Sequence, residues 1–165
     1  MKYPVALFIG RFQPFHNGHA WEVEEALKKA EKVIIGIGSS NVNDENNPYD
    51  VVLRDRMIHK VIDEYGWKER VVGVIPIPDT TDPQWVRNVV RGVEGLGYRK
   101  GETLVLGNND WVNDLLAAEL FPVHETGLYN RQELEGVKIR RMIRVGDSAW
   151  QERVPKGVAE ILIGV

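Results

Sequence analysis

The sequence predicts an α/β fold built on a doubly wound, parallel five-stranded sheet with helices on both faces. Short β-rich apolar runs recur along the 165 residues, and they lack the alternation of apolar and polar residues that marks a half-exposed strand. Segments with apolar residues at helical spacing lie between these runs. Regular alternation of strand and helix favours right-handed β-α-β crossovers in one sheet.

Four apolar runs predict the first four strands. They lie at residues 5–10, 32–39, 71–78 and 103–108, and they read VALFIG, KVIIGIGS, VVGVIPIP and TLVLGN. Strands that are buried on both faces of a parallel sheet have this near-continuous apolar character. A fifth strand is expected within residues 121–129, FPVHETGLY.

Helices are expected between the strands and after the last one. The predicted segments are residues 20–32, 50–66, 83–93, 110–120, 136–146 and 158–165. Lys28, Lys29 and Lys32 lie toward the end of the first segment, where cations interact favourably with the helix dipole. Pro83 suits the first turn of the third. The whole pattern is Rossmann-like.

The composition is that of a compact soluble protein, with 43% apolar and 27% charged residues. A chain of this length can bury one sizeable core and is too short for two comfortable domains, so we expect a single domain over residues 1–165. The net charge of −3 does not provide the broad positive surface typical of nucleic-acid binding, so no nucleic-acid partner is expected.

The sequence contains no cysteine and no long apolar run. The absence of cysteine excludes disulfides and cysteine-ligated zinc or iron–sulfur sites. The apolar run before Arg11 is too short for a signal peptide, and no run approaches membrane-spanning length. We therefore expect a cytoplasmic protein that does not insert into membranes.

Polar and glycine residues gather at the ends of the predicted strands. They occupy residues 11–19, 39–43, 79–85 and 107–109. Ligands of doubly wound sheets bind beyond the carboxyl ends of the strands, where the strand order reverses. The agreement between the predicted architecture and these residues indicates a ligand site at that edge.

The stretch GRFQPFHNGHA, residues 10–20, has the chemistry of a phosphate site. Gly10 and Gly18 permit a tight turn and a close approach of ligand to backbone. The amides that open the next helix then face an anion. Arg11 offers a guanidinium fork for phosphate oxygens, and His16 and His19 can donate ring N–H bonds. Phe12 and Phe15 are expected to pack in the core.

Other interpretations of this stretch are less consistent with the sequence. A zinc site through His16 and His19 needs at least a third ligand, and His124 is the only distant candidate, so no protein-held metal is expected. Alternatively, Arg11 and the two histidines could be solvated loop residues that bind no ligand. The occurrence of glycine, arginine and two histidines together at one strand end argues against this alternative. The glycine patterns of dinucleotide-binding folds and P-loops are absent.

GRFQPFHNGH resembles the H-x-G-H motif of the nucleotidyltransferase superfamily, and the chain as a whole resembles archaeal nicotinamide-mononucleotide adenylyltransferases. The resemblance runs nearly end to end. It continues through IIGIGSS, NPY and Arg54, through IPIPD and the following WV, and through LGN and IRRM. It implies that residues 1–165 form one nucleotidyltransferase domain.

The resemblance implies a reaction and its participants. The enzymes of this family join the α-phosphate of ATP to the 5′-phosphate of a mononucleotide and release pyrophosphate, with Mg²⁺ bound to the nucleotide phosphates. ATP and nicotinamide mononucleotide are therefore the expected small-molecule partners, and NAD the expected product. The family is commonly oligomeric, so a homo-oligomer is expected.

The resemblance also assigns roles to individual residues. The residues expected to act in catalysis are His16, His19 and Arg11, with His19 steadying charge at the α-phosphate. The residues expected to bind ATP are Gly10, Arg11, His16, Gly18, His19, Gly107, Asn108 and Arg140. The residues expected to bind the acceptor are Asp79, Asp82 and Trp85, with Trp85 stacking on the nicotinamide ring.

Several of these residues also have a purely structural interpretation. Trp85 lies in an apolar helical segment and could pack in the core. Asn108 and Asn109 could cap the helix that begins near Asp110. Arg140 could belong to a solvated face, and Arg54, to which we assign no functional role, could form ion pairs on a helix surface.

The chain departs from the family at three positions. Glu135 and Val137 replace the Ser and Thr of the pattern S-x-T-x-x-R, whose hydroxyls help to hold phosphate. The charge of Glu135 opposes a triphosphate if it points inward, and Lys138 can partly offset it. Asp82 replaces an expected Asn in a loop that is one residue short. Because aspartate can accept only from an amide, we expect a preference for nicotinamide over nicotinic acid mononucleotide.

Two further functions remain open on the sequence alone. The chain could transfer AMP or CMP to another phosphorylated acceptor, such as phosphopantetheine or a polyol phosphate; the shortened loop keeps this open. It could also be a catalytically weak nucleotide-binding sensor that lost the Ser and Thr hydroxyls. Intact His16, Gly18 and His19 argue against the sensor.

Overall fold

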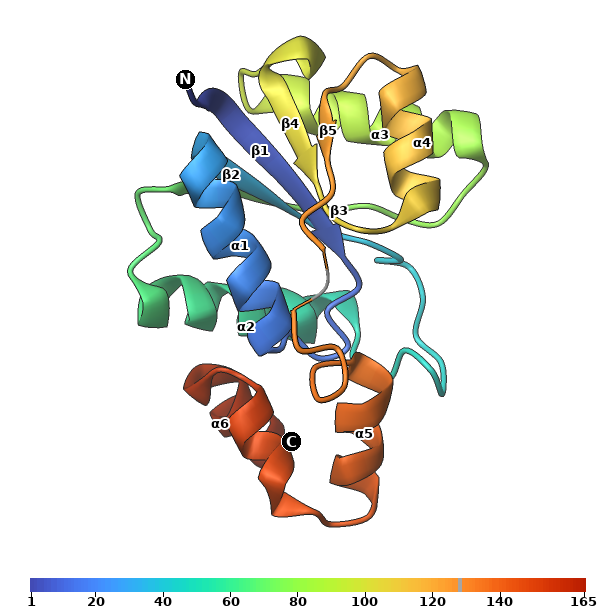
Figure 1. Ribbon diagram of the computed structural model, residues 1–165. Helices are drawn as coiled ribbons and strands as arrows, with labels where there is room; N and C mark the ends of the chain where they lie inside the picture. The colour runs from blue at the N-terminus through green and yellow to red at the C-terminus, as the bar shows by residue number, and fades with distance from the viewer. Residues whose placement is uncertain (128) are drawn as a thin grey trace.

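Five parallel strands form one sheet in the computed structural model, which describes residues 1–127 and 129–165 (Figure 1). The strands are β1 (Tyr3–Gly10), β2 (Ala30–Ile37), β3 (Val71–Pro76), β4 (Thr103–Leu106) and β5 (Val123–His124). Their order is β3-β2-β1-β4-β5: β2 and β3 are added on one side of β1, and β4 and β5 on the other. The strand order therefore reverses between β1 and β4. The predicted doubly wound, Rossmann-like topology is confirmed.

Helices cover both faces of the sheet. They are α1 (Asn17–Lys29), α2 (Val51–Tyr65), α3 (Asp82–Gly95), α4 (Asp110–Ala118), α5 (Gly136–Arg144) and α6 (Lys156–Ile163). Figure 1 shows α3 and α4 on one side of the sheet, with α1 and α2 on the other. The helix α6 packs against α2, so the C-terminal part of the chain extends the layer that α1 and α2 begin.

Successive residues of the central strand enter different cores. Ala6 and Phe8 of β1 belong to the larger apolar cluster, under α1, α2, α5 and α6. Val5 and Leu7 belong to the smaller one, under α3 and α4. Because each face of β1 is buried by a helical layer, its sequence shows no apolar–polar alternation.

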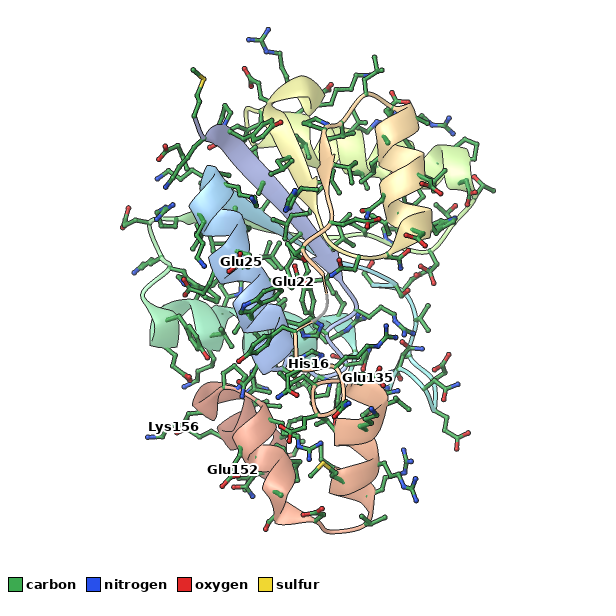
Figure 2. All side chains as sticks on the ribbon, viewed as in Figure 1. His16, Glu22, Glu25, Glu135, Glu152 and Lys156 are labelled. Atoms are coloured by element: carbon green, nitrogen blue, oxygen red, sulfur yellow. The ribbon has the colours of Figure 1, made fainter. Side chains whose placement is uncertain are left out.

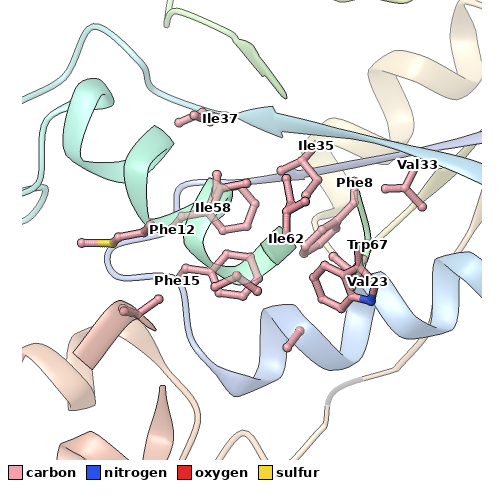
Figure 3. Close-up of a cluster of buried hydrophobic side chains, with 14 of the residues drawn as sticks. Phe8, Phe12, Phe15, Val23, Val33, Ile35, Ile37, Ile58, Ile62 and Trp67 are labelled. Carbon is pink, nitrogen blue, oxygen red and sulfur yellow. The ribbon is translucent and has the colours of Figure 1, made fainter. Parts of the chain in front are cut away.

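The aromatic residues after β1 fill the larger core, as the sequence predicted (Figure 3). Phe12 and Phe15 are fully buried and their rings stack with centroids 5.4 Å apart. Phe12 has a φ of 54°, in the left-handed region that non-glycine residues seldom adopt. This backbone conformation turns the chain sharply beyond the sheet, so Arg11 stays outside while Phe12 enters the core.

The structure differs from the prediction in the details of several elements. Short 3₁₀ helices at Lys100–Glu102 and Ser148–Arg153 were not predicted. The fifth strand is limited to Val123–His124, much shorter than the apolar segment 121–129, of which residue 128 lies outside the described residues. Within the described residues, no helix combines the length and apolar character needed to cross a membrane.

Arg54 on α2, to which we assigned no functional role, is fully buried, so the alternative of ion pairs on a helix surface does not apply to it. Its guanidinium donates to the carbonyl oxygens of Arg11 at 2.9 Å, Gly38 at 2.8 Å and Ser39 at 3.1 Å, and its Nε donates to that of Asp50 at 3.3 Å. These carbonyls belong to the segments that follow β1 and β2. Arg54 therefore ties two strand ends together and fixes the backbone that carries Arg11.

Replacing Arg54 with alanine should destabilise the fold by about 3 kcal/mol or more, because several buried carbonyls lose their donor at once. Urea-induced unfolding measures this change. Arg56→Ala, on the exposed side of the same helix, is the matched control and should stay within about 0.5 kcal/mol of wild type. Equal, small effects of the two substitutions would contradict the structural role of Arg54.

Candidate active site

A cavity of about 500 Å³ opens beyond the carboxyl ends of β1 and β4. Its walls come from the segment after β1, the first turns of α1, the start of α4 and the segment that leads into α5. Every residue that was predicted to bind ATP lines it: Gly10, Arg11, His16, Gly18, His19, Gly107, Asn108 and Arg140. The structure thus brings these residues together, and their roles remain predictions.

Two histidines build the start of α1 by capping it reciprocally. The Nδ1 atom of His16, the N-cap residue, accepts from the backbone N–H of Gly18 at 3.0 Å. The Nδ1 atom of His19 accepts from the backbone N–H of His16 at 3.1 Å. This is the geometry of a capping box in which imidazole nitrogens replace the usual hydroxyl and carboxylate oxygens.

The capping contacts determine where each histidine carries its proton. An Nδ1 atom that accepts from an amide is unprotonated, so the ring proton of a neutral imidazole lies on Nε2. The two rings stack with centroids 3.7 Å apart and planes 21° apart, and both line the cavity. Each histidine is therefore arranged as a neutral Nε2–H donor.

Burial keeps both rings uncharged at neutral pH. It lowers the pKa of His16 to about 4, with Glu135 acting weakly in the opposite direction. Burial, and then the proximity of His16, lowers the pKa of His19 well below its usual value. In the free protein the histidines therefore act as neutral N–H donors, and the positive charge of the cavity comes from other residues.

Gly18 leaves room for the His16 ring. A Cβ atom at this position would lie 2.8 Å from Cε1 and 3.0 Å from Nδ1 of His16. These distances are shorter than ordinary carbon contacts, so any other residue would displace the ring that caps the helix. The glycine of the H-x-G-H motif is required here by side-chain packing as well as by access to the backbone.

Two arginines supply the positive charge of the cavity. Arg140 on α5 donates to the carbonyl oxygen of Gln13 at 2.6 Å, and Arg11 donates to Asn47 Oδ1 at 3.4 Å. Within the described part of the chain, neither guanidinium pairs with a carboxylate. Burial lowers the pKa of Arg140, and the charge of Arg11 lowers it further, as expected when two cations face one space. An anion between them would relieve this repulsion.

Glu135 faces the same cavity but its charge is compensated. It occupies the N-cap position of α5 without making a side-chain cap bond. Arg131 donates to its carboxylate, and Lys138 Nζ lies 3.7 Å from it. The Arg131 hydrogen bond is the main reason why the pKa of Glu135 is lowered. Lys138 offsets Glu135 as expected, with Arg131 as a partner that we did not predict.

Sequence analysis missed Glu22, a buried carboxylate on α1 that lines the cavity (Figure 2). Its neighbours are Asn108, whose Nδ2 donates to it at 3.0 Å, and Thr126, whose hydroxyl donates at 2.7 Å. Asn108 therefore binds the cavity wall and does not cap α4; that role belongs to Asn109, which accepts from Val112 N–H at 3.2 Å.

The predicted acceptor-binding residues lie outside this cavity. Trp85 is only 2% exposed and packs in the smaller core, with its ring centroid 4.8 Å from that of Trp111. Asp82 begins α3 on the surface. Asp79 follows β3, where its carboxylate accepts from Ser39 Oγ at 2.9 Å. The stacking role of Trp85 and the specificity role of Asp82 remain predictions.

The described residues contain no group of three or more His, Asp or Glu side chains placed to hold a metal ion. The distant His124 lies on β5, outside the set of residues that lines the cavity around His16 and His19.

Comparison with known sequences gives this geometry a context. The Cytidylyltransferase-like family model matches residues 7–90. A nicotinamide-nucleotide adenylyltransferase of Archaeoglobus fulgidus is 36% identical over 162 residues, which cover 95% of this chain and 89% of the relative. One of Pyrobaculum aerophilum is 34% identical, covering 95% of this chain and 86% of the relative.

Solved structures share the fold. A bifunctional NMN adenylyltransferase/ADP ribose pyrophosphatase of Francisella tularensis superposes with a TM-score of 0.83 at 22% identity, over 99% of this chain. This chain spans 50% of that bifunctional protein. The same protein complexed with AMP and a manganese ion superposes with a TM-score of 0.77.

The low pKa of His16 predicts a pH-dependent stability. At position 16 the unfolded chain binds a proton below about pH 6.5, whereas the folded chain binds it only below about pH 4. The free energy of unfolding therefore decreases as the pH falls through this window. The whole pKa difference corresponds to a loss of about 3 kcal/mol in the free energy of unfolding. Because asparagine is a good N-cap residue, His16→Asn keeps an acceptor while removing the titration.

Urea-induced unfolding at pH 7 and pH 4 measures the difference. Wild type should lose about 3 kcal/mol more than His16→Asn between the two pH values, because only wild type must protonate a buried ring at position 16. Equal losses would show that His16 is not held neutral in the folded state.

Proposed function

The chain belongs to the nicotinamide-nucleotide adenylyltransferases, and on that premise we propose that it joins ATP to nicotinamide mononucleotide, giving NAD and pyrophosphate. The observation that carries the proposal is the convergence, in one cavity, of two Nε2–H donors, the N-terminus of α1 and two guanidinium groups without a carboxylate partner. Such a set of groups is complementary to a polyphosphate.

The proposed reaction is an in-line displacement at phosphorus. An oxygen of the acceptor's 5′-phosphate attacks the α-phosphorus of ATP and forms the new P–O bond. The bond from the α-phosphorus to the oxygen that bridges to the β-phosphate breaks, and its electron pair leaves with pyrophosphate. The enzyme contributes positioning and stabilisation of developing negative charge, and no covalent intermediate is involved.

Each group has a distinct part in this scheme. His16 and His19 direct Nε2–H bonds at phosphate oxygens from fixed orientations, so little reorganisation is needed as charge develops. Arg11, after β1, and Arg140, on α5, bring positive charge to the cavity, and their mutual repulsion falls when the triphosphate enters. The dipole of α1 adds to the same field.

Mg²⁺ enters this scheme as part of the substrate, bound to the ATP phosphates. Arginines, and imidazoles whose Nδ1 atoms already accept backbone N–H bonds, suit a phosphate-carried metal, because they contact phosphate oxygens without competing for the ion. Residues 1–165 act as one nucleotidyltransferase domain in the cytoplasm. Assembly into a homo-oligomer remains an expectation from the family resemblance.

Pyrophosphate release with a panel of acceptors tests the function. The protein is incubated with ATP or CTP, Mg²⁺ and nicotinamide mononucleotide, nicotinic acid mononucleotide, phosphopantetheine or a polyol phosphate. We expect release with ATP and nicotinamide mononucleotide. Pyrophosphate release with another acceptor only would show that nicotinamide mononucleotide is not the substrate. ATP binding without pyrophosphate release would indicate a nucleotide sensor.

His19→Ala should lower kcat by roughly 10²–10³, the loss seen when a preorganised donor to a developing anion is removed. His59→Ala is the control, since His59 is exposed on α2 and distant in sequence from the motif. Pyrophosphate release at saturating substrates measures both variants. A near-wild-type rate for His19→Ala would remove His19 from the mechanism.

The proposed preference for nicotinamide over nicotinic acid mononucleotide depends on the charge of Asp82. Wild type should show the higher kcat/KM with nicotinamide mononucleotide, and Asp82→Asn should narrow the difference. Because Asp82 lies outside the main cavity in this structure, an unchanged ratio in the variant would place the discrimination elsewhere.

A further inference from the structure

Glu22 is a buried acidic side chain in the wall of the cavity that the proposed phosphate chemistry does not use. It is 8% exposed, and burial raises the pKa of its carboxyl group. A carboxylate is an unfavourable neighbour for a polyphosphate, and a ligand group that carries a proton suits it better. Its position and its contacts identify that group.

Glu22 lies farther along α1 than the two histidines of the phosphate-binding set. It follows His19 by one helical turn on α1 and shares the helix face that lines the cavity. Figure 2 shows Glu22 farther along α1 than His16, which lies beside Glu135 at the start of α5. If the triphosphate contacts His16 and His19, the part of the nucleotide beside Glu22 and Asn108 is the nucleoside.

The hydrogen bonds around Glu22 fix the polarity of this wall. Asn108 Oδ1 accepts from the backbone N–H of Gly127 at 2.9 Å, which sets the orientation of the amide. Its Nδ2 then donates to Glu22 Oε1 at 3.0 Å and to the Gly127 carbonyl oxygen at 2.8 Å. The Thr126 hydroxyl donates to the same carboxylate. The side-chain donors are thus used internally.

The wall is left with unused acceptors. A carboxylate has about four lone-pair sites, and here Asn108 and Thr126 occupy only part of them. The groups that Glu22 can still offer toward the cavity are therefore hydrogen-bond acceptors with negative charge. A ligand atom placed there strengthens binding if it carries a proton that it can donate, and weakens binding if it carries a lone pair instead.

We propose that Glu22 is a specificity-determining residue for the nucleobase: its carboxylate accepts a hydrogen bond from the exocyclic amine of adenine and disfavours a base that places a carbonyl oxygen at that point. This inference rests on the proposed function, since it takes ATP as the nucleotide. Asn108 and Thr126 are positioning residues, because they act by holding the carboxylate.

Comparison of ATP with ITP tests the proposal, because ITP replaces the 6-amino donor with a carbonyl acceptor and also carries a proton at N1, where adenine has a lone pair. Dissociation constants are measured by calorimetry with Mg²⁺ and without an acceptor. Wild type should bind ATP about tenfold more tightly than ITP or better. Glu22→Gln should reduce the ratio by about tenfold, since an amide can donate to the carbonyl of ITP.

Glu25→Gln is the matched control, because it makes the same substitution one turn along α1 at a residue that pairs with Lys28 and does not line the cavity. It should keep the wild-type ratio. A Glu22 that merely holds α1 to the segment around Thr126 would weaken ATP and ITP alike in Glu22→Gln, and an unchanged ratio would overturn the proposal.

The same measurement separates this inference from the proposed function. Wild type that binds ATP no more tightly than ITP would overturn the role of Glu22 whatever the variant does. Tight, ATP-selective binding that depends on Glu22 supports the inference even if nicotinamide mononucleotide proves to be the wrong acceptor. Failure of wild type to bind either nucleotide would overturn both.

Discussion

The N-terminus of α1 is closed by two histidines that cap it reciprocally, and the chemistry of the cavity depends on that contact. The amides of Gly18 and His16 each donate to an Nδ1 atom, so the two rings are stacked, oriented and protonated on Nε2. The same contact satisfies backbone groups that would otherwise be exposed at a helix end. The hydrogen bonds that cap the helix are therefore the same ones that orient the Nε2–H groups as donors to phosphate.

The surrounding structure holds this helix start in place. The left-handed turn at Phe12 brings the chain out of the sheet, and Gly18 leaves space for the His16 ring. Arg54 binds the carbonyls after β1 and β2, so the backbone of Arg11 is fixed by a buried cation and its side chain stays free to meet a ligand. Glu135, unusual beside a phosphate site, is balanced by Arg131 and Lys138.

The sheet and the cavity could be predicted because their signals are local. Apolar runs mark strands that are buried on both faces, and the polar residues that follow them meet at one edge. Arg54 could not be interpreted in this way, because its partners follow two other elements in sequence. Glu22 was missed for a similar reason: its burial depends on Thr126, about a hundred residues away. Trp85 packs in the smaller core, which the apolar helical segment around it allowed and the family motif alone does not indicate.

The ring ¹⁵N chemical shifts of His16 and His19 test the tautomer and charge assignments most directly. In the free protein at pH 7, both histidines should show a protonated Nε2 and an unprotonated, hydrogen-bonded Nδ1. His16 should keep this pattern on acidification until the pH approaches 4. An Nδ1–H tautomer, or imidazolium shifts at neutral pH, would contradict the account of how this helix terminus prepares the cavity for phosphate.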